Sequence, residues 1–353
     1  VNNKLGVVPR LCRPLSRATF CLIIENMEGI NMKKLLKASL TVMMALTLSA
    51  CGGSKDVNIG IVQYAEHPAL DNAKKGFLKA LEDNGYGEDN VAFDDQNAQG
   101  DGSNCTTIAD KFVNDNVDLI FAIATPTAQA AANKTTEIPI VLSAVTDPAS
   151  AKLVKTNEKP GGNVTGTSDL TPVADQFDLL QQLLPDAKTI GIMYCNAEDN
   201  SIFQADIAKE ECAKRNLTVV DKSVTDSNQI QQVTESLIGK VDAIYIPTDN
   251  LLAEGMATVA QVANENNLPC IVGESGMVEN GGLATYGIDY YNLGYRAGLQ
   301  AVKILKGEAK PADMAIEYLP AEECELTINE KVAKKLNITI PDDLKSKAKM
   351  VNK

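Results

Sequence analysis

Residues 57–67 read VNIGIVQYAEH, and this stretch decides the fold because its first half returns later in the chain. The motif Ile-Gly-Ile at 59–61 recurs at 190–192, which is 131 residues further on (59 to 190). A short run rich in Val and Ile that ends in polar residues is typical of a buried strand. The recurrence indicates that such a strand begins each of two similar halves.

Two further matches keep the same order along the chain. The segment VDLIF at 117–121 matches VDAIY at 241–245, an offset of 124 residues (117 to 241). The segment IPIV at 138–141 resembles LPCI at 268–271, an offset of 130 residues (138 to 268). One match would mean little because such strands are common. Three matches in one order, at nearly one offset, predict two lobes of one design.

Short apolar strands alternate with amphipathic helices on both sides of this repeat. In the first half we expect strands at 57–63, 91–95, 118–124 and 138–145, and helices at 72–84 and 105–114. In the second half we expect a helix at 172–184, a strand at 283–289 and a helix at 292–306. The segment 161–168, rich in Gly and Thr, is suited to a crossing strand or hinge. The pattern predicts an α/β protein with two similar, doubly wound parallel-sheet lobes.

A signal-like segment precedes this body. Residues 32–50 begin with Met-Lys-Lys-Leu-Leu-Lys, continue through an apolar stretch and end in Leu-Ser-Ala, which is typical of a secretory signal peptide. Cys51 follows directly, as in a bacterial lipobox, so we expect a lipid on its thiol and a linker at 51–56. The alternative is an ordinary signal with a chance cysteine. Because a signal peptide should begin a chain, we expect residues 1–31 to be an extension from an upstream start-codon assignment.

Charge and cysteine content exclude several classes of protein. The chain has 33 Lys and Arg against 46 Asp and Glu, a formal charge of −13. Without residues 1–51, which hold seven of the basic and two of the acidic residues, 26 stand against 44 and the charge is −18. Nucleic acid needs a basic footprint, so it is not an expected partner. The five cysteines after Cys51 show no CxxC spacing and predict neither a zinc site nor a disulfide framework.

Motifs of common enzyme classes are missing from the sequence. His67 is the one histidine of the chain, which excludes a multi-histidine metal centre. We find no G-x-S-x-G, no P-loop, and no G-x-G-x-x-G after an expected strand. A hydrolase with an acidic pair stays open as an alternative, although no two acids are convincingly spaced for it. We therefore expect a binding protein and not an enzyme, without a metal or cofactor.

Five motifs together resemble those of a known family. They are IGIVQYAEHPALDNAKKGF at 59–77, ATPTAQAA at 124–131, AVTDPASAKLV at 144–154, GGNVTGTSD at 161–169 and GIDYYNLGYRAG at 287–298. With the lipobox, they resemble the substrate-binding lipoproteins of ABC transporters, in particular the tryptophan/tyrosine type, which have the type I periplasmic-binding fold. The resemblance covers residues 57–345.

The resemblance implies two lobes joined by a three-strand hinge. Lobe one would comprise 57–166 and 285–315, and lobe two 167–284 and 316–350. The implied function is to capture an amino acid, aromatic in this subfamily, by closing the lobes, and to deliver it to ABC permease and ATPase subunits. The protein would be an extracytoplasmic monomer anchored to the cell membrane by its lipid. Alternatives are a receptor for a nucleoside, another amino acid or a short peptide, and a sensor that presents its ligand to a membrane kinase.

The loops that follow the strands supply the candidate ligand-binding residues, because ligands of parallel sheets gather at the carboxyl ends of the strands. The candidates from lobe one are Gln63, Glu66, His67, Thr125, Thr127 and Asp147. Those from lobe two are Asn196, Thr248, Asp249, Asn250, Glu274 and Ser275. Asp289 and Tyr290 follow the late strand, which we assign to lobe one.

Acids, hydroxyls and helix N-termini in one cleft suit an amino acid. For the α-ammonium we favour Asp289, Glu274 or Asp147, although each of these acids could instead cap a helix or form a turn. Thr125 begins an expected helix whose free N–H groups suit a carboxylate, the alternative being an ordinary capped helix. His67 has no evident Ser, Cys or metal-ligand partner, so we interpret it as a ligand contact and not as a catalytic residue.

Overall fold

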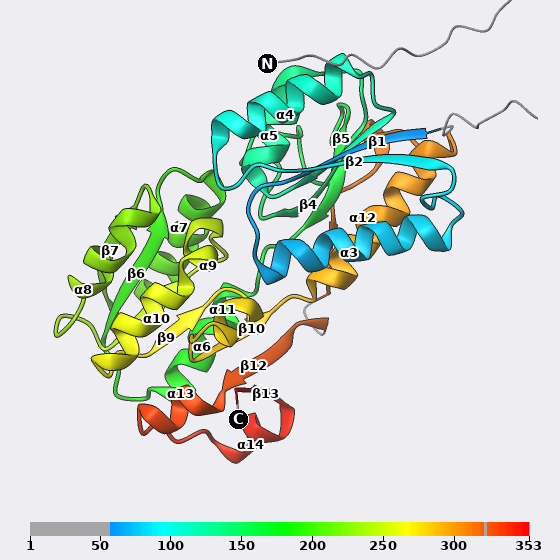
Figure 1. The fold of residues 1–353 in the computed structure, drawn as a ribbon. Helices are drawn as coiled ribbons and strands as arrows, with labels where there is room; N and C mark the ends of the chain where they lie inside the picture. Colours follow the sequence, from blue (N-terminus) through cyan, green and yellow to red (C-terminus); the bar gives the residue numbers. More distant parts are fainter. Residues whose placement is uncertain (1–56, 321–322, 353) are drawn as a thin grey trace, which may run out of the picture. The chain divides into compact units, whose positions relative to one another are not determined.

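The computed structural model describes residues 57–320 and 323–352, which belong to one unit, Lys55–Lys353. The expected extension 1–31, the signal peptide, Cys51 and the linker lie outside the described residues. None of the helices in the described ranges combines the length and the apolar character that a membrane span requires. The described chain forms two β-sheets with helices packed against them (Figure 1).

The first sheet has six strands in the order β11-β5-β4-β3-β1-β2, all paired in parallel. Its strands are β1 (Val57–Gln63), β2 (Val91–Asn97), β3 (Leu119–Ile123), β4 (Ile140–Val145), β5 (Val164–Ser168) and β11 (Glu317–Tyr318). Its helices are α3 (Pro68–Asp83), α4 (Gly102–Asn114), α5 (Thr125–Lys134), α12 (Tyr290–Leu305) and the short η2 (Pro311–Asp313). We name this sheet and its helices the six-stranded lobe.

The helices α3 and α12 of this lobe lie side by side (Figure 1). Their close approach depends on glycine, because a Cβ at Gly76 would meet the backbone of Tyr291, and one at Gly294 would meet that of Ala73. The contact attaches a late helix to the first helix of the fold, so that residues 290–305 belong with the six-stranded lobe.

The second sheet has seven strands in the order β13-β12-β10-β9-β8-β6-β7, and β12 pairs with β10 in antiparallel orientation. Its strands are β6 (Thr189–Cys195), β7 (Thr218–Val224), β8 (Ala243–Ile246), β9 (Cys270–Val272), β10 (Ala284–Gly287), β12 (Glu325–Asn329) and β13 (Lys349–Val351). Its helices are α6 (Val173–Leu183), α7 (Asp199–Lys214), η1 (Ser227–Gln229), α8 (Ile230–Glu235), α9 (Asn250–Glu254), α10 (Met256–Glu265), α11 (Ser275–Glu279), α13 (Glu330–Lys335) and α14 (Asp342–Lys347). We name this sheet and its helices the seven-stranded lobe.

The duplication read from the sequence is present in the sheets. The three matched pairs of segments form β1 and β6, β3 and β8, and β4 and β9, and each pair holds the same place in the order of its sheet. The isoleucines of both Ile-Gly-Ile motifs are fully buried. Gly60 lies against the ring of Phe112, and Gly191 lies against Leu237, so both glycines make room for a packed side chain.

The chain passes between the sheets three times. The first passage follows β5 at Ser168, the second lies between β10 and α12, and the third lies between β11 and β12, partly outside the described residues. We assigned the late strand at 283–289 to lobe one, and this was wrong: β10 pairs with β9 and β12 in the seven-stranded sheet. The domain boundaries given above otherwise stay a prediction.

Candidate functional site

A buried cavity of about 10 Å³ is lined by residues of both lobes. We name it the central cavity; its lining residues are His67, Leu70, Ala144, Thr146, Asp169, Asn200, Thr248, Asp249, Asn250, Ala253, Glu274 and Tyr290. Six of the residues that we predicted are among them: His67, Thr248, Asp249, Asn250, Glu274 and Tyr290. A volume of this size accommodates about one water molecule. A larger ligand therefore requires the walls to move apart.

Asp169 lies at the start of the first passage between the sheets and is the acid that links several walls of the cavity. Its carboxylate accepts hydrogen bonds from Tyr290 Oη at 2.9 Å and from Thr146 Oγ1 at 3.2 Å. Burial raises the pKa of Asp169 to about 6, and the two donated hydrogen bonds oppose that rise. Asp169 was not among the site residues that we predicted from the sequence.

A second group of carboxyls comes from the seven-stranded lobe. Asp249 caps α9 by accepting from Leu252 N at 2.8 Å, and it also accepts from Cys195 N at 2.5 Å. Glu198, directly before α7, accepts from Asn250 Nδ2 at 2.5 Å and from Leu251 N at 3.3 Å. Burial raises the pKa of both acids, that of Glu198 to about 7, and their mutual repulsion adds to the rise at Glu198.

Glu274 is the one acid of our three ammonium candidates that lines the central cavity. It caps α11, with its carboxylate accepting from Gly276 N at 2.6 Å and from Met277 N at 2.7 Å. Burial raises its pKa to about 7. No Lys or Arg is present among the described residues that line the cavity, so its electrostatic character is acidic.

His67 enters the cavity from the six-stranded lobe, at the N-cap position of α3. Its side chain is only 6% exposed, and neither ring nitrogen has a hydrogen-bond partner within the described part of the chain. Burial lowers its pKa to about 4; the nearby Asn250 amide and Asp71 oppose the shift, although Asn250 does not reach hydrogen-bond geometry. At neutral pH the ring is therefore uncharged, with one N–H donor and one nitrogen acceptor.

Hydrogen bonds connect the two lobes beside the cavity. Gln204 on α7 donates from Nε2 to Thr146 Oγ1 and to the carbonyl of Thr248, both at 3.0 Å, and accepts from the Thr248 hydroxyl. Near the surface, Gln129 Nε2 on α5 donates to Asp199 Oδ2 on α7 at 2.8 Å. Separation of the lobes at these positions must break the bonds from Gln204 to Thr146 and from Gln129 to Asp199, whereas the bonds between Gln204 and Thr248 lie within the seven-stranded lobe.

Several predicted residues serve local structure outside the central cavity. Asp147 accepts from Ser150 N at 2.6 Å and from Asn157 Nδ2 at 2.9 Å, so it has the turn role that we considered as its alternative. Thr127 donates to the carbonyls of Ile123 and Ala124, both at 2.8 Å.

The other predicted residues outside the cavity lie in the same loops. Gln63 donates to Ala65 O and Asp71 Oδ1, Asn196 is exposed and donates to Ser223 Oγ, Thr125 is buried at the start of α5, and Glu66 is exposed. Their ligand roles stay predictions.

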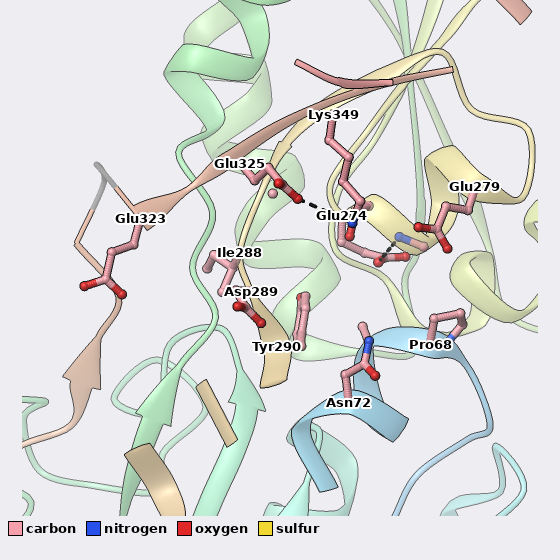
Figure 2. A pocket seen from close by; sticks show the side chains of 14 residues that line it. Pro68, Asn72, Glu274, Glu279, Ile288, Asp289, Tyr290, Glu323, Glu325 and Lys349 are labelled. Carbon is pink, nitrogen blue, oxygen red and sulfur yellow. Dashed lines mark hydrogen bonds and ion pairs between the residues drawn. The ribbon is translucent and has the colours of Figure 1, made fainter. Parts of the chain in front are cut away.

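A polar cleft of about 410 Å³ adjoins the central cavity and shares Glu274 and Tyr290 with it. Figure 2 shows Pro68 and Asn72, from α3, below Glu274 and Glu279. Ser275 and Asp289 also line this cleft; Asp289 is exposed and caps α12 by accepting from Asn292 N at 3.1 Å.

The acids of the cleft are partly neutralised by ion pairs. Glu325 pairs with Lys349 at 3.5 Å (Figure 2), and Glu323 pairs with Arg296 at 2.9 Å. Among the described residues, no group of three acids, histidines or cysteines could hold a metal ion. We therefore take the central cavity, whose polar groups are buried, as the candidate ligand site.

Two mainly parallel sheets of matching strand order, with a polar cavity lined by both lobes, define the type I periplasmic-binding class. The chain belongs to the ABC transporter substrate binding protein family, whose profile matches residues 58–352. It is thus an extracytoplasmic substrate-binding protein that binds a small-molecule ligand and works with ABC transporter components. This confirms the family, the fold class and the binding-protein function predicted from the sequence.

Three relatives are informative. A tyrosine-binding protein of Clostridioides difficile (strain R20291) is 49% identical over 285 residues, 80% of this chain and 82% of the relative. A crystal structure of an ABC domain from Streptococcus pneumoniae in complex with L-Trp is 40% identical, has a TM-score of 0.80, and covers 83% of this chain and 99% of its own. A ligand-free, open structure of a substrate-binding protein with adhesive properties from Clostridium difficile is 48% identical, with a TM-score of 0.65 and coverage of 84% and 99%.

Proposed function

We propose that this protein is the lipid-anchored receptor of an ABC importer for an aromatic amino acid, tyrosine or tryptophan, and that it catalyses no reaction. The relatives named above, one called tyrosine-binding and one in complex with L-Trp, support the ligand class. Lipidation of Cys51 would hold the receptor at the outer face of the membrane as a monomer. From there it would deliver the ligand to a permease with its ATPase.

The observation that carries the proposal is the acidic character of the buried central cavity. Asp169, Asp249 and Glu274 line it without a cationic side chain among the described lining residues. Burying carboxylates without a cation is unfavourable, and a cationic ligand group relieves that cost. Asp169 is our candidate for the ammonium, because Tyr290 and Thr146 occupy only part of the acceptor capacity of its carboxylate.

Closure of the lobes would complete the binding step. A cavity of about 10 Å³ cannot admit an aromatic amino acid, so the lobes must separate for binding and close afterwards. The structure superposes better on the complex with L-Trp than on the ligand-free, open relative, although the latter has the higher identity. This supports a closed arrangement in which Gln204 bonds to both lobes.

Titration of the full chain with a panel of ligands tests the proposal. L-Tyrosine, L-tryptophan and L-phenylalanine should raise the unfolding temperature, whereas L-alanine, L-glutamate, uridine and a dipeptide should not. At a hundredfold excess over Kd, a ligand stabilises a protein by about 2.7 kcal/mol, which corresponds to roughly 4–5 °C in a folded unit of this size. Mass spectrometry should recover the bound amino acid unchanged. If no aromatic amino acid shifts the transition, the proposed ligand class is wrong.

A further inference from the structure

Five helices, α3, α7, α9, α11 and α12, place N-terminal residues in the lining of the central cavity, and their N-termini differ. The first turn of α9 is capped by the carboxylate of Asp249, and that of α11 by the carboxylate of Glu274. The N-cap of α3, His67, makes no side-chain hydrogen bond to its helix. The N-terminus of α12 is likewise capped, by Asp289, and α7 begins at the acid Glu198. Of the five, α3 is the one that begins at a side chain other than an acid.

The first turn of α3 has N–H groups available for an acceptor. The helix begins at Pro68, which has no N–H, and the earliest turn bond runs from Asp71 N to His67 O at 3.1 Å. Within the described residues, no acceptor is found for the N–H groups of Ala69 and Leu70. The helix is 16 residues long, so its N-terminus carries the partial positive charge of a full helix dipole. Leu70 itself lines the cavity.

His67 provides a second, independent observation at the same place. Its side chain is 6% exposed, lines the cavity and has no partner for either nitrogen among the described residues. A buried polar group without a partner costs free energy, which a ligand acceptor at the imidazole N–H would recover. No lysine or arginine among the described lining residues competes for an anion.

We propose that the N-terminus of α3, with the N–H of His67, is the subsite for the α-carboxylate of the bound amino acid. The N–H groups of Ala69 and Leu70 and the imidazole would donate to its two oxygens, while the ammonium faces the acids of the cavity. Backbone N–H groups and the helix dipole are a general means of binding an anion without a cationic side chain. This inference rests on the proposed function, because it requires a zwitterionic ligand.

The test compares L-tyrosine with tyramine, which has the same ring and ammonium but no carboxylate. Isothermal titration of the full chain measures the Kd of both, and L-tryptophan with tryptamine serves as a second pair. The loss of at least two charge-assisted bonds predicts a Kd for tyramine that is higher by roughly 100-fold or more. In His67→Asn the side chain would cap the first turn and compete with the ligand carboxylate, since Asn is a preferred N-cap. In this variant the ratio of the Kd for tyramine to the Kd for L-tyrosine should fall to about threefold or less.

A matched control separates this effect from helix capping in general. Asp101 caps α4 in the same lobe, accepting from Ser103 N at 2.6 Å and Asn104 N at 3.1 Å, and does not line the cavity. Asp101→Asn should keep the wild-type ratio of the two Kd values. Thermal unfolding should show that His67→Asn folds with stability equal to or above wild type.

The outcomes distinguish this subsite from the proposed function. The subsite is supported if the ratio of the Kd for tyramine to the Kd for L-tyrosine decreases in His67→Asn and stays at the wild-type value in Asp101→Asn. Tight binding of L-tyrosine with the same ratio in both variants would overturn the subsite and leave the proposed function standing. If neither amino acid binds the wild-type chain, the proposed function fails and the subsite fails with it.

Discussion

His67 and Glu198 occupy the same position in the two halves of the chain, 131 residues apart (67 to 198). Each follows the first strand of its lobe and is the N-cap of the next helix, with extended backbone angles of φ −153° and ψ 159° at His67 and φ −117° and ψ 119° at Glu198. The duplication thus preserved the backbone at this junction. The two side chains differ in charge and in their hydrogen-bond partners.

The two junctions differ in their hydrogen-bond partners. Glu198 is surrounded by donors, accepting from Asn250 Nδ2 and Leu251 N, while His67 has no hydrogen-bond partner in the described ranges. Asn250 lies between them, because it donates to Glu198 and also influences the pKa of His67. One junction is a carboxyl group held by hydrogen bonds, and the other is a neutral ring at a helix N-terminus without a side-chain cap.

Making the two junctions alike should have the largest effect. His67→Glu places a carboxylate where we expect the ligand carboxylate, and like charges in contact cost several kcal/mol. We expect the affinity for L-tyrosine to fall by about 100–1000-fold, measured by isothermal titration. His67→Gln, which is polar but uncharged, should lose far less and serves as the control. Equal losses in both variants would show that charge at this junction is not what matters.

Replacing the acid that we assign to the ammonium should have the next largest effect. Asp169→Asn removes a charge from a buried hydrogen bond, for which we expect an affinity loss of roughly 30–100-fold. The matched variant is Asp147→Asn. Asp147 also follows a strand of the same sheet, but its carboxylate is held in a turn by hydrogen bonds from Ser150 and Asn157. This variant should bind L-tyrosine like wild type. If Asp147→Asn lost affinity and Asp169→Asn did not, Asp147 would again be the candidate for the ammonium, as we predicted from the sequence.

The fold was predictable because its signals are local. Buried strands such as 57–63 and 138–145 are continuous apolar runs, and three repeated segments fixed the order of two similar lobes. The error concerns a chain passage, which periodicity does not encode. The chain leaves the six-stranded sheet directly after 161–168, where we expected a crossing, but the strand at 283–289 lies in the other sheet, where it pairs with β12.

The site was predicted only in part because strand-end loops hold more polar residues than a cavity can use. Asp147 and Asp169 both follow strands, and no local pattern tells a turn acid from a cavity acid. The difference arises from three-dimensional contacts: Asp169 meets Tyr290, which is 121 residues away in sequence. Glu198 could have been found from the sequence, because the repeat places it opposite His67.

Proton linkage separates the acidic side of the cavity from the histidine side. Burial raises the pKa of Asp169 to about 6 and that of Glu274 to about 7, so both bind protons that an arriving ammonium should expel. His67, with its pKa lowered to about 4, stays neutral between pH 5 and 7. Binding should therefore release protons. The affinity should fall as pH drops below about 7 through Glu274, and more steeply below about 6, where Asp169 is also protonated, by up to about tenfold per pH unit for each linked carboxyl.

Titration calorimetry in two buffers of different ionisation enthalpy measures this release directly. Asp169→Asn should reduce the number of protons released. Without ligand, the same acids bind more protons in the folded than in the unfolded state, so their contribution to the free energy of unfolding should decrease as pH rises from about 4 to 7. Proton uptake on binding, instead of release, would contradict the placement of the ammonium beside these acids.

The smallest expected effect concerns the bond that joins the lobes near the surface. Gln129 donates to Asp199, the residue after Glu198, at 2.8 Å, so this bond reports whether α7 moves relative to α5 during closure. An exposed hydrogen bond contributes about 0.5–1 kcal/mol, so Gln129→Ala should raise the Kd for L-tyrosine by about two- to fivefold. The increase should lie in the dissociation rate, because the bond forms only after closure. Stopped-flow measurements determine both rates. If the association rate fell and the dissociation rate stayed unchanged, the bond between Gln129 and Asp199 would also be present in the open form.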